Sequence, residues 1–284
     1  MESGGSLTAS IWAMIEAAQA SANQEEPGDY VKDGLLYCGK CHTPKQAIVN
    51  VCGEMRTIFA ACECKERQNK KEEADLKMHE RRQRIEQLRK AAFSESDMQD
   101  WTFENDDSPN SKPSQIARNY TKNFREMMER GKGLIFYGTV GTGKTYLAAC
   151  IANALIDKGI PCIVTSVQRF LNTLPGMFEG RQEYIDKLNS ADLLILDDLE
   201  SERDTEFTRE MVYSIIDGRC RARLPLIVTT NLTAEKLKNP AEMSRQRTYS
   251  RLLEMCIPVE VKGADRRREK LKEDYNDLKD VLGL

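Results

Sequence analysis

The sequence predicts an α/β protein in which a small metal-binding module precedes a parallel sheet covered by helices. Three observations support this fold class. Apolar strands alternate with helical patterns over residues 114–232, a glycine-rich phosphate-binding motif joins one strand to one helix, and two cysteine pairs lie near the N-terminus. Alternating strands and helices indicate a parallel sheet, because each crossover between parallel strands is long enough to hold a helix.

Composition limits the classes of function. A chain of 284 residues has room for one large core and a smaller unit. It has no apolar run long enough to cross a bilayer and no secretion signal at its start, so we expect a cytoplasmic protein without membrane contact. The net charge of −3 means that any DNA contact requires a local basic surface. Nine cysteines in a reducing compartment are expected to be metal ligands or core residues.

The N-terminal part is predicted to contain a zinc-ribbon-like module over residues 31–66. Cys38 and Cys41 form a CxxC pair, and Cys62 and Cys64 form a CxC pair further along the chain. Two close pairs at this separation can supply four thiolates to one Zn²⁺, and the runs AIVNV and RTIFAAC between them predict the strands of a hairpin.

Two further donors lie in this module, and both are expected to be non-ligands. His42 directly follows a ligand cysteine, and Cys52 lies within the predicted hairpin. Before the module, residues 1–30 are predicted to be a polar segment with a short amphipathic helix, which either covers its own domain or docks a partner.

A charged helix is predicted to link the module to the main domain over residues 67–97. Its sequence alternates acidic and basic residues, which favours a solvated spacer held by i,i+4 pairs, with nucleic-acid binding as the alternative because its end is mildly basic. The main domain is predicted over residues 98–268 and a charged tail over residues 269–284.

The phosphate-binding motif is a P-loop of the pattern GxxxxGK[ST], preceded by the strand-like run GLIFYG and followed by a helical pattern. Its glycines allow the backbone N–H groups to surround phosphate oxygens, and the helix directs its positive end to the same place. The lysine is expected to reach the β- and γ-phosphates of ATP and the last threonine to bind Mg²⁺. The motif consists of Gly138, Thr139, Val140, Gly141, Thr142, Gly143, Lys144 and Thr145.

Polar residues follow two more predicted strands. Asp197 follows the run LLIL and is expected to bind Mg²⁺, because a hard cation prefers oxygen ligands beside the phosphates. Asp198 is the candidate for polarising the attacking water, and Asn231, after the strand LPLIVTT, for contacting the γ-phosphate or that water. The remaining cysteines of this domain are expected to be small core residues: Cys150, Cys162, Cys220 and Cys256.

Several motifs in order resemble the DnaC-type bacterial and phage helicase loaders, a branch of the AAA+ ATPases that also includes the IstB-type transposition helpers. The resemblance covers about residues 98–268, and the cysteine module resembles the N-terminal region of the phage and DnaI-like loaders. It implies a five-stranded parallel sheet. The segments that carry it are ARNYTKNF, GKGLIFYGTVGTGKTYLAACIANAL, LLILDDLESERDTEFTREMVYSIIDGR, PLIVTTNL and SRLLEMC.

The resemblance also implies roles for residues outside the P-loop. Arg251 is similar to the arginine finger that enters the ATP site of a neighbouring subunit, with Arg247 as the nearby alternative. Arg267 resembles the sensor 2 arginine, although it lies within a run of three arginines. Gln168 and Arg169 match the segment that faces single-stranded DNA in this family.

Three functions are compatible with these features. The first is an ATPase of weak, assembly-dependent activity that forms a spiral on single-stranded DNA and loads a DnaB-type replicative helicase, gripped through the zinc-bearing region. The second is a transposition helper with the same chemistry and a transposase as partner. The third is a DNA-binding adaptor in which the nucleotide only stabilises the fold.

Overall fold

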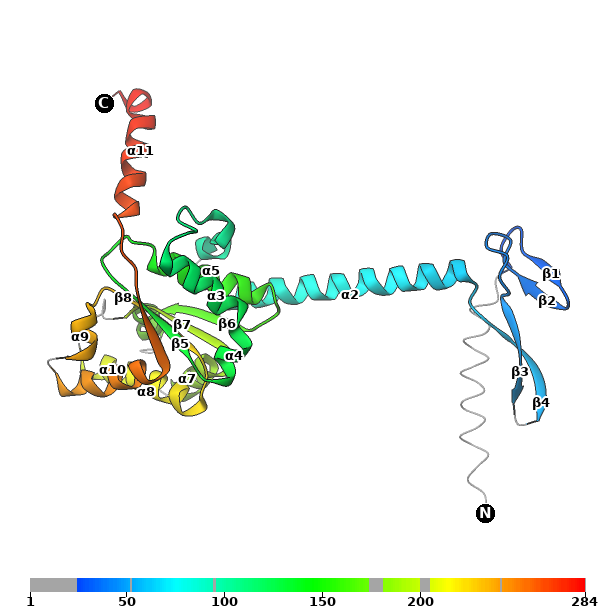
Figure 1. The fold of residues 1–284 in the computed structure, drawn as a ribbon, viewed down its shortest axis with the longest axis horizontal. Coiled ribbons are helices and arrows are strands. Elements are labelled where there is room, and N and C mark those ends of the chain that lie inside the picture. Colours follow the sequence, from blue (N-terminus) through cyan, green and yellow to red (C-terminus); the bar gives the residue numbers. More distant parts are fainter. Residues whose placement is uncertain are drawn as a thin grey trace, which may run out of the picture. The chain divides into compact units, whose positions relative to one another are not determined.

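The computed structural model describes residues 25–51, 53–93, 96–173, 181–199, 205–240 and 242–283, and the chain divides into two compact units, residues 1–80 and 81–284. The expected N-terminal amphipathic helix and Cys52 lie outside the described residues. The elements are shown in Figure 1.

The first unit contains two antiparallel hairpins. The predicted hairpin is formed by β3 (Gln46–Val51) and β4 (Glu54–Phe59). A second one, which the sequence analysis did not predict, pairs β1 (Tyr30–Lys32) with β2 (Leu35–Tyr37). Its turn is the dipeptide Asp33-Gly34, with φ of 53° and 79°, and Asp-Gly is a strong hairpin signal because both positions need positive φ.

The charged segment forms α2 (Glu63–Ala92), a helix of 30 residues that passes from the first unit into the second. Exposed i,i+4 ion pairs lie along it, as the charge pattern predicts, and they join Glu63 to Arg67, Glu73 to Lys77 and Glu86 to Lys90. At its end Ala92 is buried in the core of the second unit.

The second unit is built on a five-stranded sheet in the order β6-β7-β8-β5-β9, and every neighbouring pair is parallel. This confirms the predicted α/β fold. The order puts the P-loop strand in the interior, between β8 and β9. The strands are β5 (Gly133–Tyr137), β6 (Cys162–Ser166), β7 (Leu193–Leu199), β8 (Leu226–Thr230) and β9 (Cys256–Glu260).

Helices cover both faces of the sheet and enclose two apolar clusters (Figure 1). One face carries α3 (Lys112–Lys122) and α5 (Lys144–Ile156), and the other carries α7 (Arg181–Ser190), α8 (Glu206–Ala222) and α10 (Met243–Met255). The remaining elements are η1 (Ser96–Asp100), η2 (Phe103–Asn105), α4 (Phe124–Glu129), α6 (Val167–Thr173), α9 (Ala234–Lys238) and α11 (Arg266–Leu282).

Two segments differ from the sequence-based expectation. The helical spacing of the segment SQIARNYTKNFREMMER predicts one helix before the P-loop strand, but this helix is divided at Asn123, whose side chain donates to the carbonyl of Asn119 at 2.9 Å and so competes with the backbone for that acceptor. Residues 269–282 of the expected charged tail are helical, within α11, which begins at Arg266. The apolar residues Leu271, Tyr275, Leu278 and Val281 of this helix are exposed.

Candidate functional site

The P-loop connects β5 to α5 through left-handed glycines. Gly143 has a φ of 95° and caps the N-terminus of α5. Gly138 has a φ of 145°, and a Cβ atom there would lie 2.4 Å from the carbonyl oxygen of Val261. Glycine is therefore required by conformation and by space, and the loop can present backbone N–H groups at the positive end of a helix.

Lys144 begins α5 with its side chain buried, and Nζ donates to the carbonyl of Thr139 at 2.7 Å. Burial lowers the pKa of Lys144, whereas the nearby carboxylates of Asp198 and Asp197 act to raise it. The positive charge of Arg267 also lowers the pKa of Lys144. The predicted lysine, carboxylates and sensor 2 arginine thus lie close enough to share one electrostatic environment.

The sequence suggested that Asp197 and Asp198 follow the strand, but both residues lie within β7 (Leu193–Leu199). Asp198 has a φ of 53°, and the ladder between β7 and β8 is irregular between Leu196 and Leu199. Thr229 on β8 fixes this bulge, since its hydroxyl donates to Asp197 Oδ1 at 2.6 Å and accepts from the Asp198 N–H at 2.9 Å. Bulges beside active sites re-aim side chains, which explains how adjacent strand residues both reach the site.

Two cavities bring the predicted residues together. A cavity of about 510 Å³ is lined in part by Lys144, Thr145, Asp198, Asn231 and Arg267. A neighbouring cavity of about 290 Å³ shares Thr145, Asp198 and Arg267 and adds Asp197 and Gln168. The ends of β5, β7 and β8 therefore converge as expected, with the N-terminus of α11 beside them.

One wall of the larger cavity was missed by the sequence analysis. The ring of Trp101 lies against Tyr146, with centroids 5.8 Å apart, and the Tyr146 hydroxyl donates to the carbonyl of Thr102 at 2.7 Å. Arg266, next to the predicted sensor, lines the cavity too and pairs with Asp107 at 2.7 Å. The aromatic residues Trp101 and Phe103 at the start of the predicted domain were the available signal. This wall suits a planar base.

The predicted finger lies elsewhere on the second unit. Arg251 is on α10, where Nε lies 3.2 Å from Asp217 Oδ1 and Nη1 lies 2.9 Å from Glu254 Oε2. None of the described cavities that touch the P-loop includes Arg251 or Arg247 in its lining. Arg251 therefore does not act on its own chain's pocket in this arrangement, and its role towards a second copy stays a prediction.

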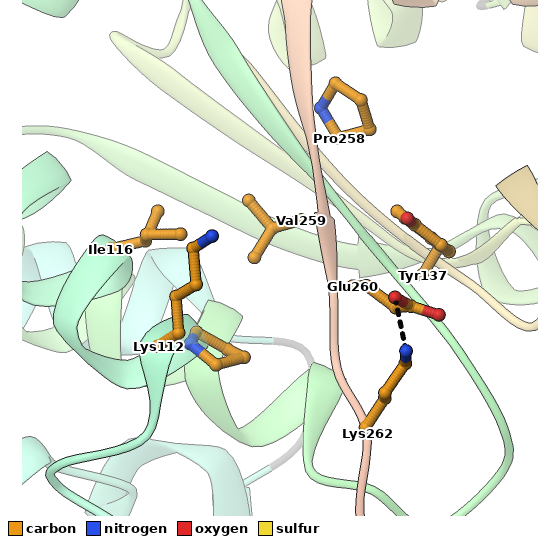
Figure 2. A pocket seen from close by; sticks show the side chains of 8 residues that line it. Lys112, Ile116, Tyr137, Pro258, Val259, Glu260 and Lys262 are labelled. Atoms are coloured by element: carbon orange, nitrogen blue, oxygen red, sulfur yellow. Dashed lines mark ion pairs between the residues drawn. The ribbon is translucent and has the colours of Figure 1, made fainter.

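The predicted DNA contacts lie on α6. The side chains of Gln168 and Arg169 are both exposed, and Gln168 lines the smaller cavity. Their contact with DNA stays a prediction. A further cavity of about 470 Å³ between α3 and β9 contains none of the predicted residues, and Figure 2 shows it from close by. Its lining residues are Lys112, Pro113, Ile116, Tyr137, Pro258, Val259, Glu260 and Lys262.

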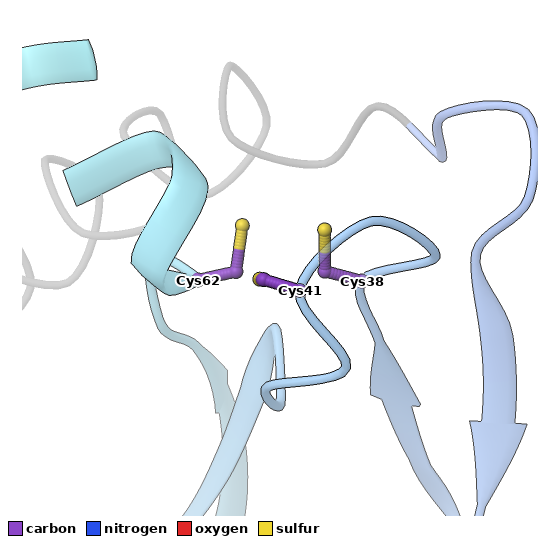
Figure 3. Close-up of side chains that lie close together, drawn as sticks. All are labelled: Cys38, Cys41 and Cys62. Carbon is purple, nitrogen blue, oxygen red and sulfur yellow. The ribbon is translucent and has the colours of Figure 1, made fainter. Parts of the chain in front are cut away.

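The candidate metal centre lies in the first unit. The sulfur atoms of Cys38, Cys41 and Cys62 all lie within 4.8 Å of one another, and Figure 3 shows them converging from the loop after β2 and the start of α2. Cys64 is not part of that close triad, but its hydrogen bond to Cys41 and its burial raise the pKa of its thiol to about 11. Hydrogen bonds from Thr43 lower the pKa of Cys41 to about 5.

The neighbouring groups fit a structural thiolate site. Asp29 accepts from the N–H of Gly39, between the first two cysteines, at 3.0 Å and from Lys45 Nζ at 2.5 Å. The hydrogen bond from Lys45 is the main reason why the pKa of Asp29 falls to about 2. His42 Nδ1 lies 3.3 Å from the hydroxyl of Tyr30, outside the sulfur triad. The three close thiols, of which those of Cys38 and Cys62 are buried, match the ligand preference of Zn²⁺.

The sheet order and the P-loop at the end of an interior strand define a P-loop ATP-binding domain of the AAA+ class. The profile described as IstB-like ATP binding protein matches residues 64–274, so the chain belongs to this family. Within the described parts of the chain, no helix combines the length and the apolar character that crossing a bilayer requires.

Similar proteins include helicase loaders. The chain is 27% identical over 197 residues to the replicative helicase loader DnaI of Bacillus subtilis (strain 168), covering 63% of this chain and 62% of that protein. It is 26% identical over 125 residues to the replicative helicase loader DnaC of Escherichia coli (strain K12), covering 43% of this chain and 50% of that protein. The matches thus span about half to three-fifths of these relatives.

Solved structures support the same fold. A DnaC helicase loader crystal structure superposes with a TM-score of 0.51 at 26% identity, over 59% of this chain and 100% of that chain. A DnaI crystal structure gives a TM-score of 0.53 at 24% identity, over 63% of this chain and 98% of that chain.

Proposed function

We propose that this chain is an ATP-dependent loader that places a DnaB-type replicative helicase on single-stranded DNA during DNA replication. The observation that carries the proposal is the convergence of Lys144, Asp198, Asn231 and Arg267 on one cavity, in a family whose relatives named above include helicase loaders. ATP binding orders copies of the chain into a spiral, and hydrolysis releases the loader.

Each site residue has a defined task in this proposal. The P-loop N–H groups and Lys144 bind the phosphates, and Thr145 and Asp197 hold Mg²⁺, which neutralises phosphate charge when bound. Asp198 orients the attacking water, and its short side chain is consistent with weak hydrolysis. Asn231 and Arg267 contact the γ-phosphate.

In this proposal the first unit binds the helicase and the second unit binds and hydrolyses ATP. The zinc-bearing region grips the helicase, and the neighbouring copy supplies Arg251 to the ATP site. Gln168 and Arg169 on α6 face single-stranded DNA, and their exposure supports this assignment.

The decisive experiment is capture of the partner by the full chain, with and without ATP. We expect a purified DnaB-type helicase to be retained and a transposase of the IS21 type not to be retained. The second candidate, a transposition helper, is favoured by the description of the matching family profile. Retention of the transposase alone would therefore replace the loader proposal with that alternative.

Lys144→Ala is expected to lower ATP hydrolysis by about 100-fold or more, because it removes the cation from the transferring phosphate. Phosphate release in the presence of single-stranded DNA measures the effect. Lys158→Ala is the matched control, because Lys158 lies just beyond α5 and donates to the carbonyl of Thr121 at 2.8 Å. Equal activity of the Lys144 and Lys158 variants would contradict the assignment, and absence of turnover in every form would support the adaptor.

Trp101→Ala is expected to weaken ATP binding by about 5- to 150-fold, since stacking of a base on an aromatic ring contributes roughly 1–3 kcal/mol. Titration with a fluorescent ATP analogue measures the affinity, and Trp101→Phe, which keeps a ring, is expected to retain most of it. An alanine variant that binds as tightly as the unchanged chain would remove Trp101 from the base-binding wall.

A further inference from the structure

Thr43 contacts both halves of the candidate metal centre. Its hydroxyl oxygen lies 3.1 Å from Cys41 Sγ and accepts from the N–H of Glu63 at 3.1 Å. Its carbonyl accepts from the N–H of Cys38 at 2.9 Å. Glu63 lies between the two cysteines of the CxC pair. One residue thus connects the CxxC pair to the chain between the other two cysteines.

The chemistry of a hydroxyl group fits this double contact. A threonine hydroxyl has one hydrogen to donate and two lone pairs that accept. While a lone pair accepts from the Glu63 N–H, the hydrogen remains to be donated to the Cys41 sulfur. A metal-bound thiolate is a better acceptor than a neutral thiol, because its charge strengthens the hydrogen bond.

The opposite side of the CxxC loop is held by other groups. Asp29 accepts from the N–H of Gly39, and a Cβ atom at Gly39 would lie 2.1 Å from the carbonyl oxygen of Gly28. The backbone of Lys45 donates to Leu36 at 2.7 Å and accepts from Ala60 at 2.9 Å. These contacts fix the CxxC loop and the ends of the hairpins, whereas the Thr43 hydroxyl reaches the start of α2.

We propose that Thr43 is a positioning residue of the metal centre, whose hydroxyl orients the Cys41 thiolate and holds the CxC pair against the CxxC pair. The inference rests on the proposed metal site and deepens it. Groups that hydrogen-bond to metal ligands fix the orientation of those ligands, and their loss typically weakens metal binding by about 10- to 100-fold.

The experiment uses the full chain and the metal alone. Thr43→Val removes the hydroxyl at nearly constant shape, and we expect it to bind Zn²⁺ about tenfold more weakly or worse in competition with a chromogenic chelator. Thr43→Ser keeps the hydroxyl and is expected to retain the affinity of the unchanged chain. Thr57→Val, at an exposed threonine of β4 in the same unit, is the control and is expected to have no effect.

A second readout separates positioning from general destabilisation. With Co²⁺ in place of Zn²⁺, the thiolate-to-metal absorption band of the valine variant is expected to shift or weaken even at saturating metal, while the serine variant keeps the original band. A valine variant with unchanged affinity and spectrum would overturn the inference, as would a serine variant as weak as the valine one. If the unchanged chain binds no metal, the metal site itself fails, which is a distinct result.

Discussion

Arg251→Ala is expected to lower ATP hydrolysis by about a thousandfold while leaving ATP binding intact, because an arginine finger stabilises charge that develops only in the transition state. In the isolated chain the guanidinium pairs with Asp217 and Glu254, and it lines none of the described cavities that touch the P-loop. Hydrolysis then requires a second copy that presents this side chain. Phosphate release and equilibrium binding of a fluorescent ATP analogue separate the two effects.

The alternative is that Arg251 only makes surface ion pairs, and a neighbouring arginine tests it. Arg221 pairs with the same Asp217 at 2.7 Å and is highly exposed, so Arg221→Ala removes an ion pair to the same carboxylate without removing the proposed finger. Asp217 is buried and keeps Arg251 as a partner in this variant, so we expect the control to retain nearly full activity. Full activity of Arg251→Ala would show that Arg251 is not the finger and would leave Arg247 as the remaining candidate.

Mixing two inactive variants gives a further test of whether two copies of the chain together form one ATP site. Lys144→Ala copies retain the finger, and Arg251→Ala copies retain an intact pocket. In mixed assemblies an intact pocket lies beside an intact finger, so activity is expected to recover with mixing. Without recovery, the finger would have to act within its own chain.

The P-loop and its partners were predictable because their signals are local or topological. The motif lies between a strand and a helix in sequence, and the ends of parallel strands meet at one edge of the sheet, so the sequence alone predicts that Lys144, Asp198 and Asn231 lie together. The approach of Cys38, Cys41 and Cys62 was predictable for a similar reason, since the spacing of the cysteine pairs restricts which thiols can approach one another, whereas Cys64 as a fourth ligand stays a prediction.

The supporting residues were not predictable, because their contacts join positions far apart in sequence. Thr229, on the neighbouring strand, donates a hydrogen bond to Asp197 beside a bulge in β7. The sequence of β7 contains no pattern that predicts this bulge. Arg266 pairs with Asp107, although most of the domain's sequence lies between them. Thr43 contacts Glu63, from which a hairpin separates it in sequence. Such side chains look like ordinary polar residues until the fold brings their partners within reach.

Removal of the metal is expected to unfold residues 30–66 and to leave the thermal transition of the second unit unchanged. Over the described part of this segment the buried apolar side chains are Leu36, Cys38 and Cys62, so there is little core to hold the hairpins together. Structural Zn²⁺ in comparable small units contributes on the order of 10 kcal/mol, far more than so few side chains can.

Hydrogen exchange after chelation measures this effect segment by segment, and calorimetry follows the second unit in the same sample. Cys38→Ser is expected to reproduce the loss of protection without a chelator, because it removes one thiolate of the sulfur triad. Cys220→Ser is the control, since Cys220 lies on α8 in the other unit. Full protection of residues 30–66 after chelation would mean that hydrogen bonds such as those of Asp29 and Lys45 hold the module without metal. The mutual approach of Cys38, Cys41 and Cys62 would then need a different explanation, because it would serve no ion.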